Sequence, residues 1–184
     1  MFVAIGCAIA STMAAVGIGT ASGHWTRPAR SSSKPTAQPI RASDRATAVV
    51  FLQRTIRLLA VNEYARAWTT LDPSQQRFVP RDEYVRCEAA SPIPGALAQI
   101  VPLAARLERV SVAGADRNPL DSVAVRFRLA FAPRPKHAAV VVRVKAHALR
   151  SDGRWTWMLS ARRFALHTSG RCGLPQPFIP GPSL

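Results

Sequence analysis

The sequence predicts an α+β fold in which three N-terminal helices pack on a four-stranded antiparallel sheet. Two observations predict it. Apolar residues recur every three or four positions between residues 44 and 90, and every second position between residues 110 and 162. Helical segments followed by strands are typical of α+β domains. The hydrophobic fraction of 48% is that of a chain that folds, and residues 44–172 are enough for one domain with its own core.

The helices are expected over about residues 44–61, 63–71 and 80–90. Ser43 or Asp44 can cap the first helix, because short polar side chains accept a hydrogen bond from a free N–H of the first turn. Asp72-Pro73 ends the second helix, since the residue before a proline avoids helical geometry. Pro80 suits the first turn of the third helix.

The strands are expected near 110–112 and over 123–131, 140–149 and 155–162, in an antiparallel meander. Ser151-Asp152-Gly153 forms a hairpin turn between the last two. Residues 96–105 follow neither period, and Pro102 interrupts whatever they form. One side of the sheet should face the helices through alternate apolar positions. These are Val123, Val125, Phe127, Leu129, Phe131, Val140, Val142, Val144, Ala146, Ala148, Trp155, Trp157, Leu159 and Ala161.

The N-terminal residues 1–23 are predicted to be a signal peptide or a membrane anchor. Residues 2–23 carry no charge and end in small residues, the pattern of a cleavable signal. The domain is therefore expected outside the cytoplasm, secreted or membrane-tethered. No Lys or Arg precedes the apolar run, so an uncleaved anchor with a cytoplasmic domain remains the alternative. Residues 24–43 read as a flexible tether rich in Pro, Ser and basic residues, and 173–184 as an irregular Pro-rich tail.

The chain is strongly basic, with 25 Lys and Arg against 10 Asp and Glu and a net charge of +15. A coding preference for Arg over Lys can explain why nearly all of the basic residues are arginine, but not why acidic residues are scarce. A basic surface attracts a partner such as an acidic protein or an anionic envelope component. Basic residues fall at the strand positions opposite to the core, where they form a solvated exterior or a docking face. These are Arg126, Arg128, Arg143, Lys145, His147 and Arg162. Aromatic residues are missing among them, which disfavours nucleic acid.

Cys87 and Cys172 are the cysteines of the predicted domain, and in an exported protein such a pair favours a disulfide. The alternative is two buried free thiols. The four histidines are scattered and no C-x-x-C is present, so the sequence predicts no metal site, and it has no cofactor motif.

Catalysis has little support in the sequence, because residues 123–131, 140–149 and 155–162 contain no Asp or Glu. The helices offer polar groups for acid–base chemistry at Tyr64, Tyr84, Asp82 and Glu83. The alternative places the tyrosines at the core edge and the acids in the first turn of a helix.

The order of helices and strands, together with EYARAWTTLDPSQQ at 63–76, resembles the nuclear transport factor 2-like (SnoaL-like, cystatin-like) superfamily, in particular its exported actinobacterial members of unknown function. The resemblance covers about residues 44–165 and implies a cone-shaped fold with a curved sheet. This superfamily holds isomerases and cyclases as well as binding domains, so the fold leaves the function open. A cone can hold an apolar ligand, and we expect its walls at Tyr64, Trp68, Tyr84, Phe127, Trp155 and Trp157, which otherwise form a packed core.

The leading hypothesis is a non-enzymatic accessory domain that binds a protein, an anionic envelope polymer or an apolar ligand. The alternative is a cone-type isomerase, cyclase or hydrolase that uses the polar groups of the helices. A third reading is a basic anchor protein facing the cytoplasm, with free thiols and an affinity for nucleic acid.

Overall fold

The computed structural model describes residues 40–93, 95–116, 119–132 and 139–172. The predicted signal peptide or anchor, most of the tether, the turn at 133–136 and the Pro-rich tail lie outside these ranges. Among the described residues, no helix combines the length and the apolar character needed to cross a membrane.

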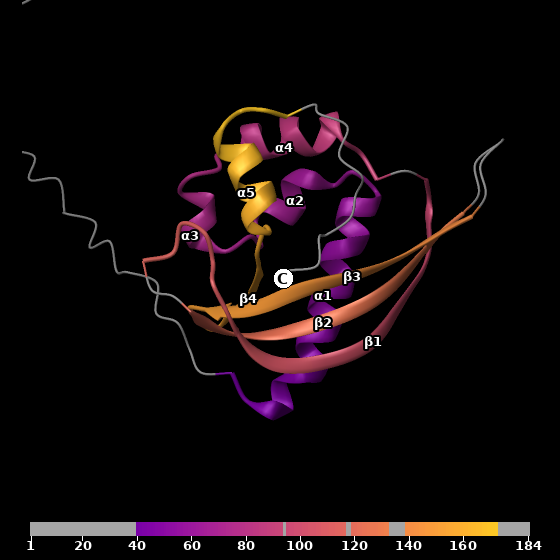
Figure 1. The fold of residues 1–184 in the computed structure, drawn as a ribbon, viewed down its shortest axis with the longest axis vertical. Helices are drawn as coiled ribbons and strands as arrows, with labels where there is room; N and C mark the ends of the chain where they lie inside the picture. The colour runs from indigo at the N-terminus through magenta and orange to yellow at the C-terminus, as the bar shows by residue number, and fades with distance from the viewer. Residues whose placement is uncertain (1–39, 94, 117–118, 133–138, 173–184) are drawn as a thin grey trace, which may run out of the picture. The chain divides into compact units, whose positions relative to one another are not determined.

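The helical segments before the sheet are a 3₁₀ turn at Ala42–Asp44, α1 (Arg45–Ala60), α2 (Tyr64–Trp68), α3 (Pro73–Gln76) and α4 (Arg81–Ala90) (Figure 1). Local chemistry sets several of their ends. The chain turns after α1 at Asn62, which has a positive φ of 62° that Asn tolerates better than most residues. Asp72 begins a new helix, since its side chain accepts a hydrogen bond of 2.9 Å from the Ser74 N–H. The sequence did not predict α3.

The sheet has the predicted antiparallel meander, with the order β1-β2-β3-β4. Its strands are β1 (Leu97–Val110), β2 (Leu120–Phe131), β3 (Val140–Ser151) and β4 (Arg154–Trp157). The predicted hairpin turn joins β3 to β4, because Ser151 pairs with Arg154 across it. Asp152 and Gly153 both have positive φ, 49° and 76°, as the tight hairpin turn requires.

Residues 96–105, which fit neither period, lie mostly within the long strand β1. Pro102 is exposed within it, and the pairing with β2 shifts between Pro102 and Ala104. A proline is tolerated there because β1 is an edge strand, where a missing N–H need not break a ladder bond. The strand predicted near 110–112 is therefore only the end of a much longer one.

The last predicted strand, 155–162, is wrong in its second half. β4 ends at Trp157, and the chain then forms α5 (Ala161–Thr168), whose first turn is capped by Ser160. Between β4 and α5, the side-chain amide of Gln75 hydrogen-bonds to both backbone groups of Leu159. Its oxygen accepts from the Leu159 N–H at 2.7 Å, and its nitrogen donates to the Leu159 carbonyl at 3.2 Å. A buried side chain thus takes the place of a neighbouring strand.

The core lies between α1 and the sheet, because α1 contacts all four strands. α2, α4 and α5 group together beside it (Figure 1). The inward positions predicted on β2, from Val123 to Phe131, are all buried. Burial alternates from Val125 onward, whereas Ser122 and Ala124 are buried although they have the opposite parity. Val140 has the inward parity but is exposed at the end of β3, and Ala161 is exposed on α5.

Candidate functional site

The outer face of the sheet, on the side away from α1, carries a cluster of arginines. Arg128 on β2 pairs directly with Arg143 on β3, and Arg126 pairs with Lys145 in the next row. Arg106 on β1 belongs to the same face, since it pairs with Ala124, which has the parity of Arg126. The sequence prediction omitted Arg106 because its segment showed no clear period.

Four of these arginines, named here the outer arginine cluster, are exposed and lack a hydrogen-bond or ion-pair partner within the described part of the chain. They are Arg106, Arg126, Arg128 and Arg143. Like charges placed directly opposite each other on neighbouring strands are destabilising. The Arg128–Arg143 pair, together with Arg106 and Arg126, therefore leaves the face with positive charge that the described residues around it do not neutralise.

Lys145 and His147 differ from the other members of the predicted basic face. The Lys145 ammonium lies 2.7 Å from a carboxylate oxygen of Glu108, so an ion pair neutralises its charge. His147 was expected at the surface, but it is buried, with its Nδ1 3.2 Å from the Ser122 hydroxyl. Burial lowers the pKa of His147, and Lys145 adds to this, although Glu108 opposes it. His147 is therefore part of the packing rather than the docking face.

Arg162 is also misplaced in the prediction. It was assigned to the sheet because residues 155–162 alternate, but it lies exposed on α5. The alternation of apolar and polar residues could not show that the pairing with β3 ends at Trp157.

The predicted cavity-lining residues contribute to the packed core. Four of them lie in the main cluster of buried residues, and the other two pack against it: Tyr64, Tyr84, Phe127 and Trp157, then Trp68 and Trp155. The indole N–H groups of Trp68 and Trp157 donate to the backbone carbonyls of Val79 and Ala67, each at 2.9 Å. Trp155 stacks on Phe51. These contacts hold the rings in place between the helices and the sheet.

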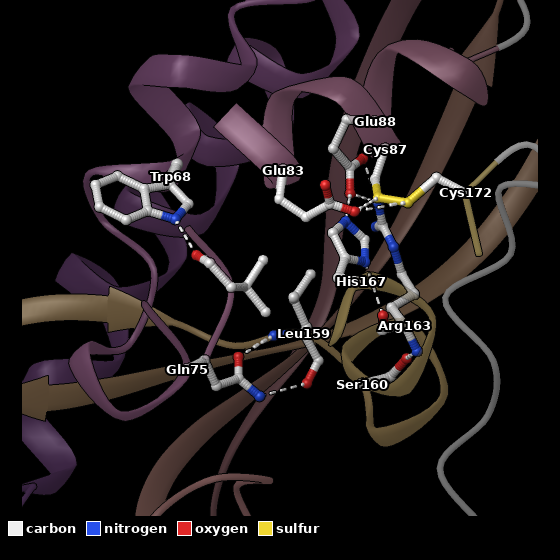
Figure 2. A network of polar contacts seen from close by, with 11 residues as sticks. Trp68, Gln75, Glu83, Cys87, Glu88, Leu159, Ser160, Arg163, His167 and Cys172 are labelled. Carbon is white, nitrogen blue, oxygen red and sulfur yellow. Dashed lines mark hydrogen bonds and ion pairs between the residues drawn. A yellow bond between two sulfur atoms is a disulfide. The ribbon is translucent and has the colours of Figure 1, made fainter. Parts of the chain in front are cut away.

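A buried charged group that the sequence prediction missed lies between α4 and α5 (Figure 2). Glu88 is only 5% exposed. Its carboxylate forms an ion pair with Arg163 through both oxygens, and one oxygen lies 2.9 Å from Nε2 of His167. The other ring nitrogen of His167 lies 2.7 Å from the Arg163 carbonyl oxygen, which fixes the ring.

The Glu88 carboxylate is held ionised. Burial disfavours its charge, but the Arg163 guanidinium and the His167 ring outweigh burial and keep the pKa of Glu88 below its ordinary value. Tyr84 stacks on His167 with ring centres 5.4 Å apart. Burial raises the pKa of Tyr84 well above its usual range, and the Glu88 charge raises it further. The tyrosine therefore stays protonated.

The acids that the sequence did single out lie elsewhere. Asp82 is exposed. Glu83 binds Arg86 on the same helix and reaches toward the sulfur atoms of Cys87 and Cys172, which form the predicted disulfide (Figure 2). The signal for Glu88 was present in the spacing, because it follows Tyr84 by one helical turn and so shares its buried face.

Comparison with known proteins finds no matching family for this sequence. Among curated proteins, no match is found either.

Proposed function

We propose that this chain is a non-enzymatic accessory domain, exported or tethered to a membrane, which binds an anionic component of the cell envelope through the outer arginine cluster. The observation that carries the proposal is the direct pairing of Arg128 with Arg143. Two cations facing each other lower the stability of a sheet unless an anion lies between them. A bound phosphate or carboxylate removes that repulsion.

The anion has to come from outside the described domain. Residues 1–43 and 173–184 contain no Asp or Glu, so these segments offer no carboxylate side chain to the cluster. A second copy that docked by the same face would place arginines against arginines, because a two-fold interface uses the same patch twice. Charge complementarity therefore favours a polyanion that is neither part of this chain nor a second copy of it.

The chemistry of the face favours a polymer without bases. A guanidinium group binds phosphate or carboxylate through two parallel hydrogen bonds. The outward positions of β1, β2 and β3 carry no Phe, Tyr or Trp among the described residues, so nucleobases would find no stacking partner there. A linear chain of phosphates fits such a face better than nucleic acid does.

The compartment and the fold family belong to the same proposal. A disulfide between Cys87 and Cys172 supports a location outside the cytoplasm, because disulfides persist in oxidising compartments. We assign the domain to the nuclear transport factor 2-like superfamily, with its N-terminal helices on a curved, cone-forming sheet. Support comes from the order of helices before a meander whose strand order follows the chain. α5 is an addition to that pattern.

Acid–base catalysis is a second candidate function, and the structure supports it less well than anion binding. Glu88, His167 and Tyr84 offer a carboxylate, an imidazole and a phenol close together, as an isomerase or hydrolase needs. All three are buried, and Arg163 already engages both oxygens of Glu88. A substrate could reach the carboxylate only if α5 moved away from α4, so the observed arrangement favours a role in packing.

The test uses the whole chain and inorganic polyphosphate, a polyanion without bases. We expect binding that weakens steeply as salt rises, since salt screens surface charges. Replacing Arg126, Arg128 and Arg143 together by Gln should weaken binding by about tenfold or more at low salt, equivalent to roughly 1.4 kcal/mol. Fluorescence anisotropy with a labelled polyphosphate measures both effects.

The matched control replaces Arg45, Arg54 and Arg57 by Gln, which removes the same charge from the exposed side of α1. It should retain most of the affinity. Equal losses in the two triple variants would show that only net charge matters, and the proposed binding face would then be wrong. Binding to polyglutamate but not to polyphosphate would point to an acidic protein instead.

A further inference from the structure

Three potential metal ligands meet between α4 and the segment that follows α5. Glu83 lies in the first turn of α4, Cys87 one turn later, and Cys172 beyond the end of α5. One carboxylate oxygen of Glu83 lies 3.4 Å from Sγ of Cys87 and 3.7 Å from Sγ of Cys172 (Figure 2). The three ligand atoms all lie within 4.8 Å of one another.

These distances match the edges of a tetrahedral metal site. Zinc binds thiolate sulfur at about 2.3 Å and carboxylate oxygen at about 2.0–2.2 Å, so two such ligands on one tetrahedral ion lie about 3.5 Å apart. Both observed oxygen–sulfur distances, 3.4 and 3.7 Å, are close to that value. Once the sulfur–sulfur bond is broken, one ion can bind all three atoms after the sulfurs separate to about 3.8 Å, the distance between two thiolates on one tetrahedral zinc ion.

We propose that the reduced form of this protein binds a Zn²⁺-class cation through Sγ of Cys87, Sγ of Cys172 and a carboxylate oxygen of Glu83. Two thiolates with one carboxylate select zinc or cobalt rather than magnesium or calcium, because soft sulfur ligands prefer transition metals. The fourth position of the tetrahedron is left to water. The sequence predicted no metal site because its histidines are scattered and no second cysteine lies within a few residues of Cys87 or Cys172.

The chemistry balances with an external dithiol as reductant. The dithiol is oxidised to its own disulfide, and its two hydrogens pass to the sulfurs of Cys87 and Cys172. Binding of Zn²⁺ then releases these two protons to solvent, since thiolates and not thiols are the ligands. The metal form replaces one crosslink by another, so Cys172 stays tied to α4 under reducing conditions.

Arg86 can support the site without blocking it. Its guanidinium binds both oxygens of Glu83, at 2.5 Å to Oε1 and 3.1 Å to Oε2. When the cation takes Oε1, the bond to Oε2 can persist and keep the carboxylate oriented, as groups around metal ligands commonly do. This site is separate from the outer arginine cluster, so the inference goes beyond the proposed binding function and does not depend on it.

The test uses the whole chain with Cys7 replaced by Ser, so that Cys87 and Cys172 are its only thiols. The protein is reduced with dithiothreitol, freed of reductant without air and titrated with Co²⁺. We expect one equivalent to bind, with the near-ultraviolet absorption of a thiolate–cobalt bond and the visible bands of a tetrahedral ion. Zn²⁺ should displace it. The oxidised protein should show neither signal.

Two substitutions on α4 identify the third ligand. Glu83→Gln should weaken Co²⁺ binding by at least about tenfold, since changes even at the groups that support metal ligands have effects of this size. Asp82→Asn, its exposed neighbour, should leave binding unchanged. The proposal is overturned if the reduced protein gives no thiolate–cobalt absorption, if the oxidised protein binds as well, or if the two substitutions have equal effects.

Discussion

At the scale of single residues, Glu88 is a buried charge that links two helices. It is 5% exposed and links α4 to α5 through Arg163 and His167. A buried ion pair is a weak source of stability as a whole, because both charges lose water. Removing one partner is a different matter, since the remaining charge then loses the ion that compensated it.

Replacing Glu88 by Gln should lower the free energy of unfolding by about 3 kcal/mol, because it leaves Arg163 without its carboxylate. Urea denaturation measures the change. The control is Glu63→Gln, which breaks an exposed pair with Arg66 and should change stability by less than about 1 kcal/mol. A loss as small as that of the control would show that the Glu88 pair contributes little.

The effect of Glu88→Gln should also depend on pH. The folded protein lowers the pKa of Glu88, so its contribution is complete above the unfolded pKa of about 4.3 and is lost as pH falls through the lower folded value. The difference in stability between the wild type and Glu88→Gln should therefore narrow in acid.

Two residues show why side-chain environments are hard to read from the sequence. His147 has the parity of the exposed face, yet it is buried beside Ser122 from β2 and Glu108 from β1. Glu88 has a charge that usually faces water, yet it is buried because Arg163 and His167 come from α5. In both cases the partners lie on elements distant in the sequence, so periodicity alone could not identify them.

At the scale of secondary-structure elements, the β3–β4 hairpin is set by its own turn residues. The two central residues have positive φ, which glycine adopts freely and which suits a two-residue hairpin. The sequence therefore predicted this turn correctly from Ser151-Asp152-Gly153.

Gly153→Ala should lower the free energy of unfolding by about 1–2 kcal/mol, since a Cβ in the left-handed region is strained. An added Cβ would meet nothing within 4 Å, so the backbone alone is responsible. Thermal unfolding measures the loss. A neutral Gly153→Ala variant would contradict this account of the turn.

β1 and α5 are the elements that local pattern misjudged. β1 is hard to predict from the sequence because it is an edge strand with many exposed positions and a register shift near Pro102. Buried and exposed residues therefore do not alternate regularly along it. The start of α5 falls inside the predicted strand 155–162, because Trp155, Trp157, Leu159 and Ala161 occupy alternate positions. The structure ends the strand where Gln75 takes over the backbone groups of Leu159, which is a contact over 84 residues.

At the scale of the whole molecule, the Cys87–Cys172 disulfide closes a long covalent loop, because its two cysteines are 85 residues apart in the sequence. Together with the Glu88 group it ties the end of the domain to α4. Both links join the same two regions, so the C-terminal part of the domain has a covalent and an ionic attachment.

Replacing Cys87 and Cys172 together by Ser should lower the free energy of unfolding by about 4 kcal/mol, because the unfolded chain is no longer closed into a long loop. Guanidinium denaturation of oxidised protein measures it. When the wild type is first reduced in the absence of metal, it should have almost the same free energy of unfolding as the double variant. An equal loss in the reduced comparison would assign the effect to the serine side chains instead.

The sequence by itself determined the α+β class, the antiparallel meander, the hairpin at Asp152-Gly153 and the pairing of the cysteines. Each depends on local period, on a turn residue or on the small number of thiols. The tertiary structure alone decided the extent of β1, the identity of α5, the burial of Glu88 and His147, and the pairing of Arg128 with Arg143. These depend on partners that folding brings together from distant segments, and burial or exposure follows from such partners rather than from the residue type.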